Sequence, residues 1–88
     1  MSMYPVVQLD TLELMSRHCP KSISAYAICL GHADDEGNCQ FTRDQIVHDL
    51  SESYARFRNH LKALAREGIL EWHEMGDTLV ITLAGIGG

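Results

Sequence analysis

Near the start of the chain, the order of apolar and polar residues predicts a short strand followed by a helix. Residues 5 to 9, PVVQL, are predicted to form a short strand, with Pro5 at its beginning, where a missing N–H does least harm. Asp10 is then expected to cap a helix of about two turns ending at His18, because Glu13 completes a capping box. The inward-facing residues of this helix are expected to be Leu12 and Met15.

A second helix is predicted from Pro20 to about Ala33. Pro20 suits the first helical turn, where its fixed φ and missing N–H carry no penalty. Behind it, apolar residues recur at i, i+3, i+4 and i+7, the spacing of one buried helical face. These residues are Ile23, Tyr26, Ala27 and Leu30. The following segment, DDEGN at residues 34 to 38, is expected to be a solvated loop, because it lacks the oxygen-ligand spacing of a calcium loop.

The segment FTRDQIVHDL, residues 41 to 50, contains a complete start signal for a third helix. Thr42 is expected to act as the N-cap, and the side chain of Gln45, three residues later, to bond back to the Thr42 N–H and complete a capping box. The helix is therefore predicted to begin at Arg43 and to end near Asp49. The residues expected to form its hydrophobic staple are Phe41 and Ile46.

A fourth helix is predicted after the short spacer LSE, residues 50 to 52. Ser53 is its expected N-cap, and Gly68 is its expected end, because glycine tolerates the positive φ at which helices commonly stop. Apolar residues between them fall on one helical face: Phe57, Leu61 and Leu64. Two helices joined by so short a turn form a helix-turn-helix.

Beyond Gly68 the apolar pattern changes to a period of two. The runs ILEWHE and TLVITL, residues 69 to 74 and 78 to 83, are rich in β-branched and aromatic residues. The intervening MGD supplies a tight turn in which Gly76 can take φ > 0, so the two runs predict a β-hairpin. The residues expected to cover the helices are Leu70, Trp72, Leu79, Ile81 and Leu83.

These elements define an α+β fold class, mostly α, in a single domain of residues 1 to 88. The core is expected to span about residues 6 to 83, with a flexible glycine-rich tail at residues 84 to 88. A chain of 88 residues with 45% apolar content supports one compact core and leaves too little sequence for a second.

The order of strand, helices and hairpin resembles a winged helix-turn-helix domain. The motif LKALAREGIL carries the resemblance, because it matches the L-x-x-L-x-x-x-G-I/L-I/L junction between recognition helix and wing. The matching residues are Leu61, Leu64, Gly68, Ile69 and Leu70. The preceding SISAYAICLGHADDEGNCQFT is similar to small winged helices of phage and plasmid replication proteins and of MarR-like regulators. The resemblance covers about residues 6 to 83 and implies DNA binding.

The composition favours a cytoplasmic protein without membrane spans or catalytic chemistry. No run approaches the roughly 20 apolar residues that cross a bilayer, and the N-terminus lacks a secretory signal. No glycine-rich phosphate loop or serine or cysteine with a recognisable base occurs, so neither an enzyme nor a cofactor is expected.

Three cysteines match no standard disulfide framework and are expected to be reduced thiols: Cys19, Cys29 and Cys39. Cys29 and His32 share a helical face, and Cys39 follows nearby, so a zinc site is an open alternative. The paired short ligand spacings of a structural zinc site are absent, and the prediction is therefore that no metal is bound.

Charge is segregated along the chain. The net charge is −5, but residues 43 to 66 carry five basic and three acidic residues, which gives +2, and the remainder carries two basic and nine acidic residues, which gives −7. The basic residues of the positive segment are Arg43, Arg56, Arg58, Lys62 and Arg66. A distribution of this kind localises any attraction for an anionic partner to one part of the surface.

The winged-helix resemblance implies that residues 54 to 67 enter the DNA major groove. Helical winding of 100° per residue turns five residues of this segment away from Phe57: Ala55, Arg58, Asn59, Lys62 and Arg66. Arg58 and Asn59 have the hydrogen-bonding geometry to read guanine and adenine edges, and the small Ala55 permits close approach. Lys62 and Arg66 are also favourable near a helix C-terminus without any ligand.

Phosphate contacts are expected at the sides and at the starts of the two helices. Arg56 lies to one side of the outward face. The other expected phosphate contacts are Thr42, Arg43, Ser51 and Ser53. The partner is expected to be double-stranded DNA, bound by two copies on a two-fold site, because one short helix reads only a few base pairs. Such a protein would act as a small transcriptional regulator or a replication accessory of phage or plasmid type.

The predicted hairpin is acidic and supports a second hypothesis. It carries carboxylates and no Lys or Arg, so it would be repelled by phosphate. The alternative function is an adaptor or inhibitor that presents an acidic loop and wing to a basic protein partner. The residues of that surface are Asp34, Asp35, Glu36, Glu71, Glu74 and Asp77.

Overall fold

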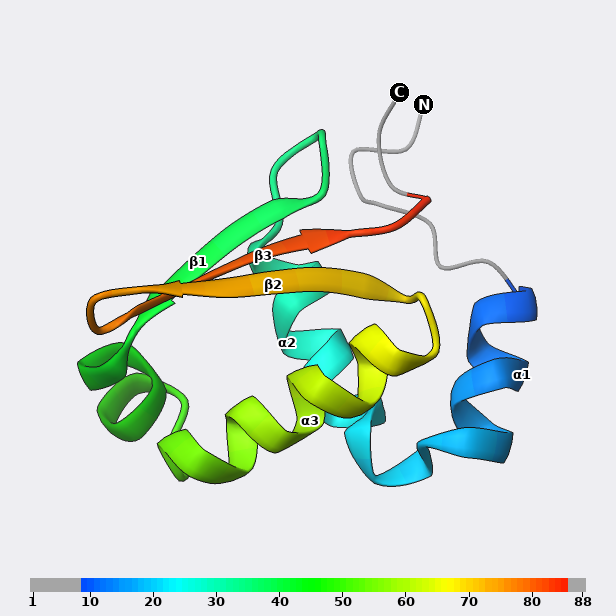
Figure 1. The fold of residues 1–88 in the computed structure, drawn as a ribbon, viewed down its shortest axis with the longest axis horizontal. Coiled ribbons are helices and arrows are strands. Elements are labelled where there is room, and N and C mark those ends of the chain that lie inside the picture. Colours follow the sequence, from blue (N-terminus) through cyan, green and yellow to red (C-terminus); the bar gives the residue numbers. More distant parts are fainter. Residues whose placement is uncertain (1–8, 86–88) are drawn as a thin grey trace.

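The computed structural model describes residues 9 to 85, which form an α+β fold with one antiparallel sheet (Figure 1). The helices are α1 (Leu9–His18), α2 (Ile23–His32) and α3 (Tyr54–Arg66). A 3-10 turn, η1 (Pro20–Ser22), precedes α2, and a π-helical turn, η2 (Gln45–Asp49), precedes α3. The strands β1 (Asn38–Thr42), β2 (Leu70–Met75) and β3 (Thr78–Leu83) lie in the order β1-β3-β2.

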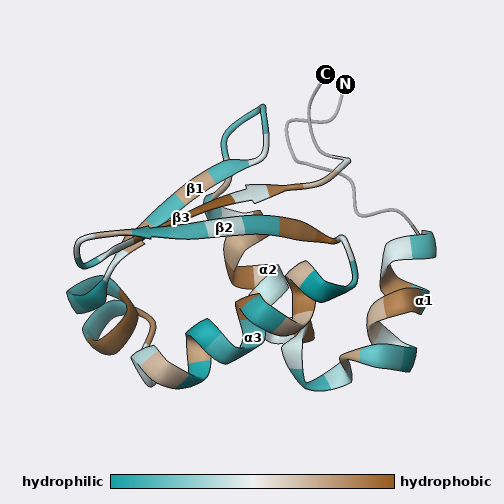
Figure 2. Ribbon diagram, in the orientation of Figure 1, coloured by the Kyte–Doolittle hydropathy of each residue, from teal (hydrophilic) through white to brown (hydrophobic). Residues whose placement is uncertain are grey.

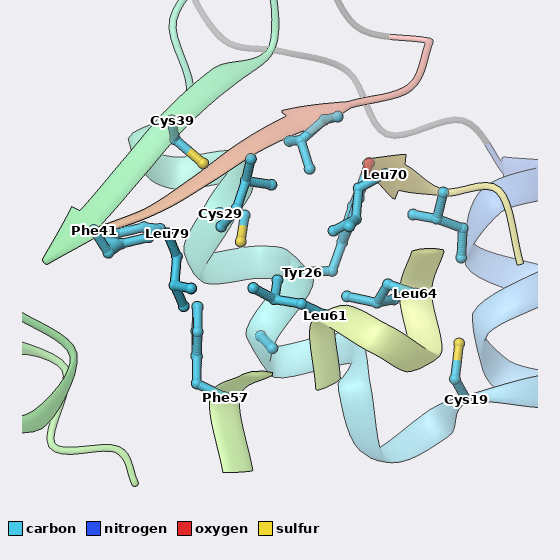
Figure 3. Close-up of a cluster of buried hydrophobic side chains, with 14 of the residues drawn as sticks. Cys19, Tyr26, Cys29, Cys39, Phe41, Phe57, Leu61, Leu64, Leu70 and Leu79 are labelled. Atoms are coloured by element: carbon cyan, nitrogen blue, oxygen red, sulfur yellow. The ribbon is translucent and has the colours of Figure 1, made fainter. Parts of the chain in front are cut away.

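The sheet has one face packed against α2 and α3, and alternation along the strands decides which residues lie there. In β3, Leu79, Ile81 and Leu83 are buried while the residues between them are more exposed. Phe41 of β1 pairs with Leu79. Side chains at every second strand position point to the same face, so the apolar residues of all three strands meet the helices. Figure 3 shows this core between the sheet and the helices.

The helix α3 forms as the sequence predicts. The Ser53 hydroxyl accepts a hydrogen bond from the Arg56 N–H at 3.3 Å, which caps the first turn. Phe57 is buried, and its ring meets that of Phe41 edge to face with centroids 5.7 Å apart. Gly68, with φ +74°, follows the helix in the left-handed conformation. In Figure 2, hydrophobic and hydrophilic segments alternate along α3, as expected for a helix with one buried face.

The predicted start of the helical turn at residues 43 to 49 is confirmed in detail. The Thr42 N–H donates to Gln45 Oε1 at 2.8 Å, and the Gln45 N–H donates to Thr42 Oγ1 at 3.1 Å. These two bonds are the reciprocal pair of a capping box. Ile46 is fully buried, and the Leu50 N–H donates to the Gln45 carbonyl at 2.9 Å, which makes the turn wider than an α-helix.

The predicted β-hairpin is also present. Strands β2 and β3 pair in register from Leu70 with Leu83 to Met75 with Thr78. Gly76 has φ +63° in the turn between them. The turn is attached to the rest of the fold, because the Arg43 N–H donates to the Asp77 carbonyl at 2.9 Å.

Predictions for the N-terminal part were partly wrong. The strand predicted for residues 5 to 9 lies outside the described residues except for Leu9, and Leu9 begins α1. Asp10 is therefore inside the helix rather than its N-cap. Met15 is buried as predicted, but Leu12 is 39% exposed. The strand β1 was not predicted: its first residue, Asn38, belongs to the expected loop, and its last two, Phe41 and Thr42, to the expected helix start.

The buried face of α2 is rotated from the predicted one. Tyr26 is buried as expected, but Ala27 is exposed, and Ile23 and Leu30 are only partly buried. The residues that enter the core are Ala25, Tyr26 and Cys29, with Ser22 just before the helix. Small side chains at two of these positions allow α2 to lie close to the sheet.

Candidate nucleic-acid interface

The outward surface of α3 gathers most of the residues predicted to bind DNA. This helix of 13 residues contains four cations and no carboxylate. Ala55, Asn59, Lys62 and Arg66 are exposed at positions i, i+4, i+7 and i+11, which is one stripe along a helix. The stripe lies opposite the buried Phe57, Leu61 and Leu64. Arg56 is exposed beside the stripe, as the sequence predicted.

Arg58 is not part of the exposed stripe, because it forms an ion pair with a residue of the hairpin. Its Nη2 lies 2.9 Å from Oε1 of Glu74 in β2, and the two side chains are 33% and 36% exposed. Among the cations of α3, Arg58 alone forms an ion pair within residues 10 to 85. The Arg58 Nε is buried without a hydrogen-bond partner in the described part of the chain. Arg58 was predicted to face outward for a base contact; it lies partly buried beside the stripe, where Glu74 occupies its guanidinium.

Glu74 also holds Tyr54, the first residue of α3. The Tyr54 hydroxyl donates to Glu74 Oε2 at 3.0 Å, so one carboxylate accepts from two residues of the helix. Burial raises the pKa of the Tyr54 hydroxyl, and the hydrogen bond and charge of Glu74 raise it further. The phenol consequently stays protonated and keeps its role as donor.

Two cations, Arg43 and Arg58, lie over the ring of Tyr54. The Arg43 guanidinium carbon lies 4.7 Å from the ring centroid, and that of Arg58 lies 5.8 Å from it. Both distances are within the range of cation–π attraction. Residues preceding η2, the start of α3 and the end of β2 thus meet in one cluster: Arg43, Tyr54, Arg58 and Glu74.

The hydroxyl groups predicted to bind phosphate have structural roles. The oxygen of Thr42 accepts from the Gln45 N–H, and that of Ser53 accepts from the Arg56 N–H. Ser51 is exposed and has a positive φ of 54° in the link between η2 and α3. Thr42 and Ser53 therefore cap the starts of η2 and α3. The exposed cations beside them, Arg43 and Arg56, are the charged groups that an anionic ligand could reach there.

The role of Glu74 was missed, although the sequence contains a signal for it. Glu74 stands two residues beyond Trp72 and four beyond Leu70, so a period of two places all three on the helix-facing side of β2. It pairs across the sheet with the buried Leu79. Periodicity therefore puts this carboxylate on the helix side of the sheet, and the packed fold places it against the first turns of α3.

Histidines and carboxylates elsewhere are used to hold the fold. His60 is partly buried at the edge of the apolar face of α3, and its Nδ1 lies 2.9 Å from the Ser22 hydroxyl, with which it forms a hydrogen bond. Asp34 Oδ1 is 2.9 Å from the N–H groups of both Glu36 and Asn38, which it accepts from. The His32 ring packs edge to face on Phe41 with centroids 5.1 Å apart.

Residues 9 to 85 offer neither a metal site nor a membrane-spanning helix. In this range no three His, Cys, Asp or Glu side chains are placed to hold one metal ion. None of the helices in the same range has the length and apolar character that a membrane crossing requires. A scan against models of known protein families finds no match, and no curated protein matches the chain.

Proposed function

We propose that the protein is a winged helix-turn-helix domain that binds double-stranded DNA with α3 in the major groove. The order of elements supports this proposal, because a strand lies between the helices, α3 follows a short turn, and a hairpin closes the sheet in the order β1-β3-β2. The hairpin is then the wing. A helix of 13 residues is about 20 Å long and fits a groove about 12 Å wide.

The observation that carries the proposal is the exposed stripe of α3 with its cations. Lys62 and Arg66 are exposed on a helix without carboxylates, in a chain of net charge −5. Placed in a groove, the stripe brings Asn59 to the base edges, and Arg56 lies at the side where phosphate runs. The protein would act as a small transcriptional regulator or a replication accessory of phage or plasmid type, bound as two copies on a two-fold site.

The acidic hairpin constrains the docking geometry. Glu71 and Asp77 are exposed, and the hairpin, residues 70 to 83, contains no Lys or Arg. Repulsion between a carboxylate and a phosphate raises the free energy of a complex that brings them together, so the hairpin is expected to face away from the duplex backbone. Binding then depends on α3 and the residues beside its start, and nonspecific affinity is low because few phosphates are neutralised.

The proposal is tested by removing two cations from α3 and two from elsewhere. The double variant Arg56→Ala/Lys62→Ala loses charge from the proposed surface, and Arg17→Ala/Lys21→Ala loses the same charge from exposed positions outside it. Duplexes selected from a random-site library by the native protein are then titrated with each variant over a range of salt. The α3 variant is expected to lower the salt slope by about 1.8, at about 0.9 per lost phosphate contact. Equal slopes for the two variants would refute the surface.

The acidic protein adaptor is the second candidate function, and one observation favours it. Asp35 and Glu36 in the loop, and Glu71 and Asp77 in the hairpin, are exposed. Charge reversal at Glu71 and Asp77 would abolish capture of a basic partner if that surface binds protein, and would leave duplex affinity unchanged or increased if α3 binds DNA.

A further inference from the structure

The strand β2 lies at one edge of the sheet, and the register shows which of its backbone groups face outward (Figure 1). The Leu83 N–H of β3 donates to the Gly37 carbonyl on the β1 side at 2.8 Å, whereas the N–H of the next residue, Ala84, donates to the Ile69 carbonyl on the β2 side at 2.9 Å. Successive residues of β3 thus bond to opposite neighbours, and every second residue of β2 bonds to β3. The residues of β2 that bond to β3 are Glu71, His73 and Met75. Those that turn their N–H and C=O groups outward are Leu70, Trp72 and Glu74.

The opposite edge strand, β1, is closed at both ends by other parts of the chain. The outward N–H of Asn38 donates to Asp34 Oδ1 at 2.9 Å, and the Asn38 carbonyl accepts from the Asp34 N–H at 2.9 Å. At the other end of β1, the Thr42 N–H donates to Gln45 Oε1 at 2.8 Å. Only Gln40 lies between these two closed positions on the outer side of β1, and one residue is too short for another strand to pair with.

The outer side of β2 has no comparable cover in the part of the chain that the structure describes. Within residues 9 to 85, no hydrogen bond reaches the outward backbone groups of Leu70, Trp72 or Glu74. The strand is six residues long and pairs with β3 in unbroken register, and it contains no proline, lysine or bulge, the features that commonly protect an edge. The edge therefore offers three successive pairing positions to an added strand.

The side chains beside this edge define the kind of strand that fits it. On the helix-facing side, Leu70 is buried and Trp72 is partly buried against the core. On the opposite side Glu71 is exposed, and the hairpin, residues 70 to 83, contains no Lys or Arg. A complementary strand is therefore apolar on one side and cationic on the other. A second copy of β2 would bring further carboxylates and no Lys or Arg, so charge favours a basic partner over a second copy of the chain.

We propose that the edge of β2 binds an extended segment of a basic protein, which adds a strand to the sheet and carries Lys or Arg at alternate positions. The main chain of the segment pairs with the outward groups of β2, and its cations lie beside Glu71. The apolar residues between the cations lie beside Leu70 and Trp72. The proposal specifies the partner of the acidic adaptor, the second candidate function, and rests on it. DNA binding by α3 uses a different surface and does not depend on it.

Synthetic peptides provide the probe for a binding titration. The test peptide alternates Lys and Val and has both ends capped, and the control peptide has the same composition with all Lys before all Val. Trp72 is the only tryptophan of the chain and lies within the edge strand, so its fluorescence reports binding there. The alternating peptide is expected to bind about tenfold more tightly than the control peptide, because only alternation places every cation on the side of Glu71.

A pair of charge variants tests the role of Glu71. Glu71→Lys is expected to weaken the alternating peptide about tenfold, because a cross-strand pair of opposite charges becomes a pair of like charges. Glu13→Lys makes the same change of net charge at an exposed position of α1 and should leave the affinity nearly unchanged. Equal losses in the two variants would show that net charge alone attracts the peptide, and would overturn the proposal.

Amide hydrogen exchange of the ¹⁵N-labelled native protein tests the location without any variant. In the free protein, the amides of Glu71 and His73 are expected to exchange slowly, and those of Trp72 and Glu74 to exchange fast. With saturating alternating peptide, all four are expected to exchange slowly.

Two outcomes of the exchange experiment would overturn the proposal. If Trp72 and Glu74 still exchange fast in the peptide complex, the peptide lies elsewhere, and signal shifts at Asp35 and Glu36 would then leave an adaptor function of the acidic loop standing. If both amides exchange slowly before peptide is added, another part of the chain or a second copy already covers the edge. Neither outcome bears on DNA binding by α3, which the duplex titrations judge separately.

Discussion

The carboxylate of Glu74 lies 2.9 Å from the guanidinium of Arg58, and this ion pair joins the hairpin to the first turns of α3. Both side chains are about one-third exposed, so solvent screens the attraction, and such pairs contribute at most about 1 kcal/mol. Glu74 nevertheless occupies the guanidinium, and a DNA phosphate would have to displace it before it could contact Arg58. The ion pair makes Glu74 a competitor of DNA for one cation of the proposed surface.

The first prediction concerns that competition. Glu74→Gln keeps the shape of the side chain but removes its charge, so Arg58 becomes available to phosphate. Duplex affinity is expected to rise, and the salt slope to grow by about 0.9, the value of one added contact. Glu71→Gln changes the net charge equally at an exposed position of the same strand. An equal gain in slope from both variants would show that only net charge matters.

The second prediction separates base reading from phosphate binding. Asn59→Ala is expected to weaken binding to a selected duplex by about 1–3 kcal/mol, because a bidentate base contact is lost, and to leave binding to unrelated duplexes unchanged. Lys62→Ala should weaken both kinds of duplex alike. Titrations of both variants against a selected and a scrambled duplex provide the measurement. Equal losses on the two duplexes for Asn59→Ala would remove Asn59 from the base contacts.

The third prediction concerns the core under α3. Leu61 is fully buried in the cluster shared by α2, α3 and the sheet, so Leu61→Ala leaves a cavity. The expected loss in the free energy of unfolding is about 2–5 kcal/mol. Lys62→Ala, one residue later on the exposed face, should change it by less than about 0.5 kcal/mol. Urea unfolding followed by circular dichroism measures both, and similar values would contradict the assigned orientation of α3.

The fourth prediction concerns two glycines that have open space where alanine would place its methyl group. An added Cβ meets no atom within 4 Å at either Gly31 or Gly68, but Gly68 has φ +74°. Gly68→Ala is expected to cost about 1–2 kcal/mol, the penalty of the left-handed conformation for a residue with Cβ. Gly31→Ala, inside α2, should stabilise the protein by up to about 1 kcal/mol. Opposite signs in thermal unfolding are the expected result, and a loss at both sites would contradict it.

The fifth prediction is a pH dependence at Cys39. Because the hydrogen bond from Cys29 lowers the pKa of Cys39, its alkylation should reach half of its maximal rate at a lower pH than an ordinary thiol does. Cys29→Ala removes the donor and leaves burial and Asp34, which both raise the pKa. The midpoint should therefore move upward in that variant, as followed by mass spectrometry of the tryptic peptide that spans residues 22 to 43 and contains Cys39. A downward or absent shift would contradict the assigned direction of the hydrogen bond.

Local signals explain which elements the sequence predicts well. The cap at Ser53, the capping box of Thr42 and Gln45, and the turn at Gly76 act over a few residues, and all three are present. The strand β1 depends instead on pairing with β3, as Cys39 does with Ile81. Pairing between residues so far apart in the sequence gives no signal in the residues of the strand itself, so β1 was not predicted.

In the candidate site too, features set by neighbouring residues were predictable and contacts between distant residues were not. The exposed stripe of α3 follows from helical periodicity, because the buried Phe57 and Leu61 fix which side faces solvent. The pairing of Arg58 with Glu74 depends on how β2 crosses the helix, and that is a property of the packed fold. Periodicity predicts the direction of a side chain, but only tertiary structure decides which charged residue meets it.

The central claim is tested most directly by mapping which residues a duplex contacts. The protein is labelled with ¹⁵N, and amide and arginine side-chain signals are recorded while a selected short duplex is added. The account predicts the largest shifts along the exposed stripe of α3 and at Arg56, with small shifts at Glu71 and in the acidic loop. Shifts confined to the hairpin and the loop, with the signals of α3 unchanged, would contradict it.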